Sequence, residues 1–320
     1  MPTLLLSPND QMWVNKVIDI FNSHEPVVLP TETVYGLAAP VSSDVAVARI
    51  YEIKERPTFN PLIMHVKEEW DLSQWAEIGD VEKKLISLFW PGPLSLLLKK
   101  KGVSDLVTAG SKKVVLRAPA HPVFREVLDA WGAPLVAPSA NSSTKLSATT
   151  AAGVLADLGE KIVAIVDGGT CEWGVESTIV EVVGDKVSIL REGAISKEDL
   201  EKHGFSLSVS TKTESTPGSQ LKHYTPSVPL YFFENEADWA SSSSKSSLYL
   251  KVLSSDSSLS FEGRNIETLS QSNNYKEAAS KLFEFLRTAQ AQYTEIRVLK
   301  TQDVSLGRAI NDRLLRASQR

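Results

Sequence analysis

The sequence predicts an α/β protein that consists of a larger N-terminal domain and a smaller C-terminal domain. Up to about residue 204, short apolar runs with many β-branched residues alternate with segments of helical periodicity. A stretch rich in Ser and Thr follows, and the alternation then returns on a smaller scale. We therefore expect a domain at residues 1–204, a linker at 205–227 and a second domain at 228–320.

The predicted strands of the first domain are short, apolar and bounded by Pro, Gly or polar residues. They are residues 25–30, 61–66, 93–100, 113–119, 134–139 and 164–169. The predicted helices, several of which begin at Asp, Thr or His-Pro, are residues 10–22, 44–55, 80–89, 121–132 and 150–159. Residues 176–193 predict a hairpin that turns at Gly184 and Asp185, so we expect a mixed sheet.

The second domain is predicted from three apolar runs and two amphipathic segments. The strands are residues 228–233, 247–253 and 295–300, and the helices are residues 273–293 and 304–318. The linker before it ends in residues 217–226, where Lys222, His223 and Tyr224 follow one another. A flexible spacer does not need these three side chains together.

Composition excludes several classes of protein. The net charge of −5 argues against a globally basic nucleic-acid-binding protein, although it leaves room for a local basic pocket. Cys171 is the only cysteine, which excludes an intrachain disulfide and a Cys-rich zinc site and fits a reducing cytoplasm. We find no apolar run near the length of a membrane span, no signal-peptide pattern, no phosphate-binding glycine loop and no His spacing typical of metal ligands.

Polar side chains follow several of the predicted strands, and this is where α/β sheets place ligands. The first strand runs directly into residues 31–36, where Thr33 can donate a hydrogen bond to an anion. The alternative is an ordinary turn that ends in Gly36. Glu32 lies in the same stretch, and a carboxylate beside an anion site is costly unless it pairs with a cation or Mg²⁺.

Cations gather near two further strands. Lys54 and Arg56, with Asn60 and His65 close behind, can neutralise a polyphosphate, although cations also favour helix C-termini for dipole reasons alone. Lys113 and Arg117 lie on one face of the strand at 113–119, because side chains alternate along a strand. Two cations on one face of an inner strand imply an anion between them, whereas on an edge strand both would reach solvent.

Small hydroxyl and amide side chains follow the strand at 134–139, and further polar residues flank the hairpin. These residues are Ser139, Asn141, Ser147, Ser177 and Arg191. Each has an alternative role as a helix cap, a turn residue or a hairpin end. Taken together, the clusters predict an anion pocket at an edge of the sheet, and five separate solvated patches are the less economical alternative.

The ordered set of motifs resembles the YrdC-like threonylcarbamoyl-AMP synthases. The motifs are "PTETVYGLAAP", "KERP" with "NPLIMHV", "KKVVLRAP", "PSANSS" and "ESTIV" followed by "LREG", over roughly residues 10–200. The tail, with "PGSQLKHYTP" and "LGRAINDRLLRAS", is similar to the long two-domain form of that family. The resemblance implies a twisted mixed-sheet domain with a basic concave pocket, a Rossmann-like C-terminal domain and a linker that covers the pocket as a lid.

The resemblance also implies an activity and a set of site residues. The family makes L-threonylcarbamoyladenylate and pyrophosphate from L-threonine, bicarbonate or CO₂, and ATP. A K-x-R and S-x-N signature gives Lys54 and Arg56 as catalytic residues. Threonine would contact Thr33, His65, Arg117, the backbone around Ala137, and Ser177. ATP would contact Arg56, Asn60, Lys113, Ser139, Asn141, Ser147, Arg191 and Tyr224.

Further expectations concern the cofactor and the partners. Mg²⁺ is expected to accompany ATP, with no metal bound by the protein alone. A downstream machinery would transfer the threonylcarbamoyl group to tRNA next to the anticodon, in the cytoplasm, and we expect neither stable nucleic-acid binding nor membrane binding. Two alternatives remain at this point. One is a module that only binds structured RNA, and the other is a carbamoyltransferase of hydrogenase maturation, whose zinc-finger segments the single cysteine excludes.

Overall fold

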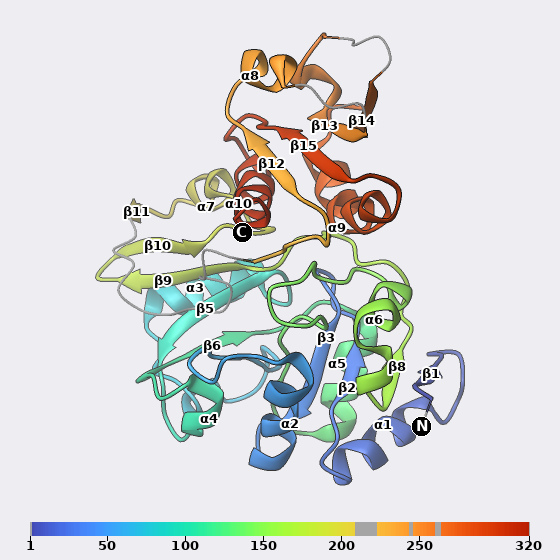
Figure 1. Ribbon diagram of the computed structural model, residues 1–320. Coiled ribbons are helices and arrows are strands. Elements are labelled where there is room, and N and C mark those ends of the chain that lie inside the picture. Colours follow the sequence, from blue (N-terminus) through green and yellow to red (C-terminus); the bar gives the residue numbers. More distant parts are fainter. Residues whose placement is uncertain (1, 209–222, 243–245, 260–263, 320) are drawn as a thin grey trace.

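The structure is a computed structural model that describes residues 2–208, 223–242, 246–259 and 264–319. Among these residues, one mixed sheet of eleven strands has the order β1-β8-β2-β3-β7-β4-β6-β5-β9-β10-β11. The strands are β1 (Leu4–Leu6), β2 (Val27–Leu29), β3 (Gly36–Pro40), β4 (Ile63–His65), β5 (Leu94–Lys99), β6 (Lys113–Arg117), β7 (Leu135–Val136), β8 (Ala164–Val166), β9 (Thr178–Val183), β10 (Lys186–Arg191) and β11 (Leu207–Ser208). The α/β class and the mixed sheet predicted from the sequence are thus confirmed (Figure 1).

Helices cover both faces of the large sheet. They are α1 (Trp13–Asn22), α2 (Asp44–Lys54), α3 (Asp80–Phe89), α4 (Asp105–Thr108), α5 (Pro122–Trp131), α6 (Ala151–Leu158) and α7 (Lys197–Lys202), with short 3₁₀ turns at Leu72–Gln74 and Gly159–Lys161. Val27 and Leu29 pack with α1 and α5 in one apolar core, whereas Val28 packs with α2 in the other. This alternation follows from the period of two along a strand.

The six predicted strands and the five predicted helices of the first domain all form. The hairpin also forms, because β9 and β10 are antiparallel and Val183 pairs with Lys186 around Gly184 and Asp185. The sequence did not indicate β1, β3 or β11. Strand β6 lies between β4 and β5, so it is an inner strand and not the edge strand of the alternative interpretation.

The second domain has a parallel sheet of four strands in the order β12-β15-β13-β14. Its elements are β12 (Leu230–Phe233), α8 (Glu236–Ser241), β13 (Ser247–Leu253), a 3₁₀ turn at Ser254–Asp256, β14 (Asn265–Ser270), α9 (Tyr275–Gln292), β15 (Glu295–Leu299) and α10 (Gly307–Ala317). Three strands and both long helices were predicted, and β14 was not. Figure 1 shows α9 and α10 on the side of the small sheet that faces the large domain.

The two domains share an apolar core. Val34, Leu146 and Val175 of the first domain belong to the same buried cluster as Leu282 and Phe283 of α9. Gly174 adds a close backbone contact, because a Cβ built there would lie 2.4 Å from the carbonyl oxygen of Ala279 in α9. Its φ of 67° also favours glycine, so both the close contact with α9 and the backbone conformation favour glycine at position 174.

The predicted linker lies partly outside the described residues. Residues 209–222, which include Lys222, are not described. Strand β11 falls within the range assigned to the linker and pairs with β10, so the large sheet continues past residue 204. The domain boundaries remain predictions. No helix among the described residues is long and apolar enough to cross a membrane.

Candidate active site

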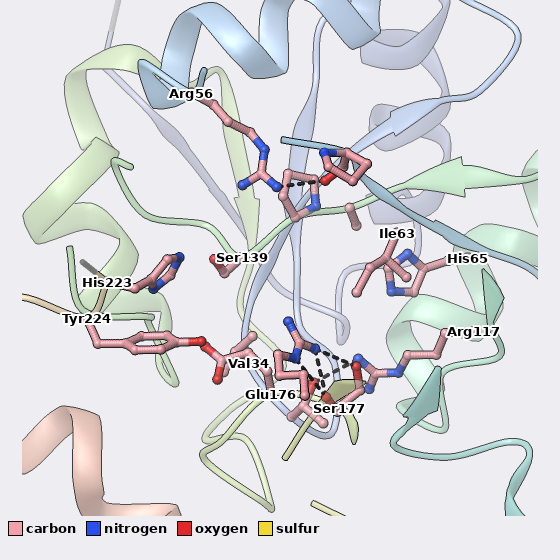
Figure 2. A pocket seen from close by; sticks show the side chains of 15 residues that line it. Val34, Arg56, Ile63, His65, Arg117, Ser139, Glu176, Ser177, His223 and Tyr224 are labelled. Atoms are coloured by element: carbon pink, nitrogen blue, oxygen red, sulfur yellow. Dashed lines mark hydrogen bonds between the residues drawn. The ribbon is translucent and has the colours of Figure 1, made fainter. Parts of the chain in front are cut away.

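A pocket lies where the ends of several strands of the large sheet meet the end of the linker (Figure 2). Its walls come from the loop after β2, the segment from α2 to β4, the end of β6, the loop after β7, the two residues before β9, the end of β10, and residues 223–224. The lining residues are Thr33, Val34, Arg56, Pro61, Ile63, His65, Arg117, Ala137, Pro138, Ser139, Glu176, Ser177, Arg191, His223 and Tyr224.

The structure brings most of the predicted site residues together in this pocket. Those that line it are Thr33, Arg56, His65, Arg117, Ala137, Ser139, Ser177, Arg191 and Tyr224. Those that do not line it are Lys54, Asn60, Lys113, Asn141 and Ser147. The assignment of each residue to threonine, to ATP or to catalysis stays a prediction.

Arg117 explains the carboxylate that the sequence left without a partner. Its Nη2 donates a 2.5 Å hydrogen bond to Oε1 of Glu32, and its Nη1 donates to Oγ1 of Thr33 at 3.0 Å. The second oxygen of Glu32 accepts from the backbone N–H of Ala120 at 3.0 Å. The Arg117 and Glu32 side chains are only 4% and 5% exposed, so this is a buried ion pair. The pair fixes the direction in which the guanidinium faces the pocket.

In the polar stretch after β2, residues 31–36, some side chains face the pocket and others face the core. The Thr31 hydroxyl donates to the carbonyl of Val34 at 2.7 Å and lies 2.8 Å from the Thr33 hydroxyl, which holds the turn. Tyr35 points the other way and donates to the carbonyl of Gly169 at 2.7 Å. Thr33 therefore faces the pocket, whereas Tyr35 is a core residue.

His65 is a buried, neutral imidazole. Burial, with a further contribution from the charge of Arg117, holds the pKa of His65 well below its usual value. Its ring lies 5.0 Å from that of Phe124, and its Nδ1 has no hydrogen-bond partner in the described structure. A neutral imidazole can donate to or accept from a ligand, but it adds no charge to the pocket.

Ser177 and Arg191 form a second polar corner at the base of the hairpin. Arg191 Nη2 donates to the carbonyl of Ser177 at 2.7 Å and to its hydroxyl at 2.9 Å, while Ser95 Oγ lies 2.8 Å from the same hydroxyl. Burial, together with the cations Arg313 and Arg117, lowers the pKa of Arg191 to about 10. Arg191 therefore remains positively charged at neutral pH.

The close approach of the hairpin to this corner depends on Gly193. A Cβ at Gly193 would lie 2.4 Å from the carbonyl oxygen of Glu176 and 2.4 Å from the backbone nitrogen of Thr178. A side chain there would push the segment after β10 away from Ser177. The "LREG" motif thus supplies both the cation and the glycine that lets the cation come close.

Arg56 provides a third guanidinium, on the opposite wall (Figure 2). Its Nε donates to the carbonyl of Asn60 at 3.1 Å and its Nη2 to the carbonyl of Pro61 at 2.7 Å. Burial, with a smaller contribution from Arg191, lowers the pKa of Arg56 to about 10, so it too is charged at neutral pH. Backbone acceptors thus hold this cation in place without neutralising it.

Lys54 lies behind the pocket wall and connects the two signature segments. Its Nζ donates to the carbonyl of Ser139 at 2.6 Å and also to the carbonyl of Asn141. Burial, to which Arg56 adds, lowers the pKa of Lys54 well below its usual value. This geometry suits a residue that fixes the loop after β7, and the catalytic role expected for Lys54 is untested.

The other predicted residues outside the lining make contacts of their own. Lys113 forms an ion pair with Glu181 of β9 at 2.6 Å, so each of the two cations on β6 has a separate carboxylate partner. Asn60 and Asn141 are buried, and the side-chain oxygen of each has no hydrogen-bond partner in the described structure. Ser147 donates to Glu176 at 2.6 Å and thus touches a lining residue.

Sequence reasoning missed two residues at the pocket, Glu176 and Arg313. Glu176 lines the pocket, and its Oε2 accepts a 2.8 Å hydrogen bond from Nε of Arg313 in α10. The two residues are 137 positions apart in the chain. The only sequence signal was a charged residue in each of the "GVESTIV" and "NDRLLRAS" motifs, and no sequence pattern indicated that these two residues pair.

The end of the linker closes one side of the pocket. His223 and Tyr224 are both buried, and their ring centroids lie 4.0 Å apart. Tyr224 stacks on Phe283 of α9 at 5.4 Å, and Figure 2 shows its phenol directed toward the side of the pocket where Glu176 lies. Burial lowers the pKa of His223 to about 3, so its ring is neutral.

The residues of the pocket do not form a protein metal site. The described residues contain no group of three or more His, Cys, Asp or Glu side chains arranged to hold a metal ion. Glu176 is the one carboxylate among the described residues of the lining, and both of its oxygens already accept hydrogen bonds from Ser147 and Arg313. The lining is instead suited to anions, since Arg56, Arg117 and Arg191 converge on it.

Comparisons with known proteins agree with this architecture. Residues 19–193 match the Sua5_yciO_yrdC family model, described as telomere recombination, and residues 195–319 match the model described as threonylcarbamoyl-AMP synthase, C-terminal domain. A threonylcarbamoyl-AMP synthase from Bacillus subtilis is 39% identical over 245 residues, which cover 73% of this chain and 70% of the relative. One from Schizosaccharomyces pombe is 39% identical over 251 residues, covering 67% of this chain and 62% of the relative.

The matched region therefore spans less than two thirds of the length of the S. pombe relative. The fold match is more extensive. The crystal structure of P. abyssi Sua5 complexed with L-threonine has a TM-score of 0.86 and is 30% identical, and the match covers 99% of this chain and 98% of that one.

Fold and site together define an α/β protein with an arginine-rich pocket in its large domain, beside the C-terminal domain. The chain belongs to the threonylcarbamoyl-AMP synthase family, in its two-domain form. The resemblance noted from the sequence motifs is thereby confirmed.

Proposed function

We propose that this chain is an L-threonylcarbamoyladenylate synthase. It would join L-threonine, bicarbonate or CO₂, and ATP to give threonylcarbamoyl-AMP, with release of pyrophosphate. The observation that carries the proposal is the convergence of Arg56, Arg117 and Arg191 on one pocket, in which the carboxylate of Glu176, the only one that the described residues contribute to the lining, is already paired. The relatives' name and the threonine complex of P. abyssi Sua5 support the same reaction.

The reaction brings three anionic groups into one small space. The threonine amine, in its neutral form, adds to CO₂ to give a carbamate, and a carbamate oxygen then attacks the α-phosphorus of ATP while pyrophosphate leaves. Two unit charges about 4 Å apart repel by about 4 kcal/mol at an effective dielectric of about 20. Offsetting this repulsion is the central energetic problem that the pocket has to solve.

The pocket offers separate cations for separate anions. We assign the threonine carboxylate to Arg117, because Thr33 and His65 lie beside it and a guanidinium can grip a carboxylate with two hydrogen bonds. We assign the phosphates to Arg56 and Arg191 on the other walls. No residue of the lining is an evident general base, so catalysis would consist mainly of positioning and charge stabilisation.

Mg²⁺ would enter with ATP. The lining lacks free carboxylates, so the ion would be held by phosphate oxygens and water, as Mg²⁺ often is in nucleotide sites. Bound in this way, it would neutralise charge on the phosphates. Chelation should then abolish turnover without changing the folded protein, which circular dichroism checks.

The product implies a partner and a location. The carbamate is unstable in water, so the pocket needs a cover, and we assign this role to Tyr224 at the end of the linker, which lines the pocket. Threonylcarbamoyl-AMP would be passed to a tRNA threonylcarbamoyl-transfer machinery. We propose that this takes place in the cytoplasm, where the tRNA substrates are.

The function is tested by pyrophosphate release from ATP and bicarbonate with each amino acid in turn. Release with threonine, and little with the other amino acids, supports the proposal. Release that does not depend on an amino acid or on bicarbonate contradicts it. Strongly salt-dependent RNA binding without ATP turnover would instead favour a nucleic-acid-binding module.

A further inference from the structure

Arg313 is a buried cation of the C-terminal domain that reaches the wall of the pocket in the first domain. It lies in α10, and its side chain is 1% exposed. Its Nε donates to Glu176 Oε2 at 2.8 Å, its Nη2 to the backbone carbonyl of Glu192 at 2.8 Å, and its Nη1 to Asp312 at 2.7 Å. Three of its donors are thus satisfied, two of them by the other domain.

Glu176 is held in one orientation by this contact and by Ser147. Ser147 donates to Oε1 at 2.6 Å while Arg313 binds Oε2, so both oxygens have a partner. Burial alone would raise the pKa of Glu176, but the charges of Arg313 and Arg191 lower it to about 2. The pocket therefore contains a full negative charge whose compensation comes largely from the C-terminal domain.

Arg313 also touches the residue that covers the pocket. Its guanidinium lies 5.3 Å from the ring centroid of Tyr224, in the range of a cation–π contact, and the same ring stacks on Phe283 of α9. Two lining residues that belong to different parts of the chain, Glu176 and Tyr224, are therefore placed by one arginine.

We propose that Arg313 is a positioning residue for the nucleotide side of the pocket: it neutralises and orients Glu176 and supports Tyr224, so that ATP binds well only when the C-terminal domain is docked. The inference rests on the proposed function for the identity of the ligand. It gives the C-terminal domain a part in the site beyond carrying the linker.

The physical reason is the sign of the charges. Without Arg313, Glu176 would lose the larger of the two positive charges that compensate it and would present a more negative wall close to the place of the phosphates, where water is excluded and like charges repel strongly. Arg117 and its partner Glu32 belong wholly to the first domain, so the removal of Arg313 should leave the side predicted for threonine unchanged.

A second ion pair between the domains provides a matched control. Arg308, also in α10, pairs with Glu198 of α7 and donates to the carbonyl of Asp303. Arg308 and Glu198 do not line the pocket. Arg308→Met therefore weakens the docking of the domains without changing the contacts of Glu176.

The experiment compares Arg313→Met, Arg308→Met and the double variant Arg313→Met/Glu176→Gln. For each, KM for ATP, KM for threonine and the dissociation constant of ATP by calorimetry are measured. We expect Arg313→Met to weaken ATP binding at least about tenfold, with KM for threonine changed less than about twofold. The double variant should recover most of the ATP affinity, because no uncompensated charge remains.

Two results would overturn the inference. One is an Arg313→Met enzyme with unchanged ATP affinity. The other is a loss of affinity in Arg313→Met that is equal for ATP and threonine, that Arg308→Met shows as well, and that the added Glu176→Gln change does not reverse. Arg313 would then only hold the two domains together. If Arg313→Met does not fold, Arg313→Lys is compared instead: it retains the positive charge beside Glu176, so ATP affinity close to that of the wild type is expected, and a loss of about tenfold would contradict compensation by charge.

The failure of the proposed function would be recognised separately. In that case the wild-type protein would release no pyrophosphate with threonine. Calorimetry with ATP needs no turnover, so the comparison of the variants would still decide whether Arg313 acts on the nucleotide side.

Discussion

Two buried ion pairs between a carboxylate and an arginine support the pocket, and they differ in the origin of the arginine. Glu32 pairs with Arg117, and both belong to the large sheet of the first domain. Glu176 pairs with Arg313, which belongs to α10 of the C-terminal domain. The first pair is complete within one domain, whereas the second exists only when the two domains are docked.

This difference separates the two halves of the pocket. The side predicted for threonine is formed by the first domain alone, so its geometry follows from the large sheet. The side predicted for ATP also depends on parts of the chain outside the first domain, namely the end of the linker, which carries Tyr224, and α10, which carries Arg313. Changes to the first pair should therefore affect threonine, and changes to the second should affect ATP.

The largest effect is expected for Arg117→Ala. It removes the cation assigned to the threonine carboxylate and leaves Glu32 buried without a partner. We expect threonine-dependent pyrophosphate release to fall at least about 1,000-fold. Arg125→Ala is the control: it removes a cation of α5 that pairs with Glu68, and pyrophosphate release should stay near wild type. Wild-type kinetics for Arg117→Ala would refute its assignment.

Glu32→Gln should mainly affect stability. The change leaves the Arg117 charge buried and without a carboxylate, and breaking such a pair costs about 3 kcal/mol in unfolding free energy. Threonine should restore part of this loss, because its carboxylate would take the place of Glu32. Chemical denaturation with and without threonine measures both effects.

The control for Glu32→Gln is Glu68→Gln, which breaks a more exposed pair with Arg125. That change should cost less than about 1 kcal/mol and should not respond to threonine. A Glu32→Gln protein as stable as the wild type would show that the buried pair does not hold this half of the pocket.

Tyr224→Ala tests the cover on the other half. The ring is buried between His223 and Phe283, and its removal opens the nucleotide side. We expect KM for ATP to rise about tenfold and the fold to remain intact. Tyr231→Ala, an exposed tyrosine of β12, is the control. Unchanged KM and unchanged turnover in Tyr224→Ala would contradict the role as a cover.

The smallest effect concerns the pH dependence of stability. Burial lowers the pKa of His223 to about 3, whereas in the unfolded chain it is about 6.5. Below about pH 6.5 the unfolded chain binds a proton that the native chain does not, so stability falls as the pH decreases toward 3. Between about pH 7 and about pH 5.5 the loss should be about 1 kcal/mol.

The pH effect of His223 can be separated from that of His65, whose pKa is also low. Thermal unfolding of the wild type and of His223→Gln is compared at both pH values. A smaller decrease in the variant is expected, and an identical decrease would show that His223 is not the group responsible.

Much of the fold could be predicted because the local signals were strong. The buried strands are short apolar runs, and all six proposed for the first domain form. Strand β3, "GLAAP", was missed because small residues and a proline have low strand propensity, and it is its position between β2 and β7 that makes it a strand. In the same way β14, "NIETLS", is largely polar and depends on β13.

Individual residues of the candidate site could be predicted from the sequence, but their ion pairs could not. Cations and hydroxyls at strand ends indicated an anion pocket, and Arg56, Arg117 and Arg191 do converge there. Pairing could not be predicted. Glu32 and Arg117 are 85 positions apart, and no local pattern shows that Lys113, four residues before Arg117, pairs with Glu181 instead.

The central claim is that the pocket joins threonine, bicarbonate and ATP in one product, and isotope incorporation tests it most directly. The protein is incubated with ATP, L-threonine and ¹³C-bicarbonate, and the nucleotides are analysed by mass spectrometry. The account predicts an adenylate whose mass includes threonine and one ¹³C atom, formed only when all three substrates are present. Consumption of ATP without an adenylate that contains the label would contradict it.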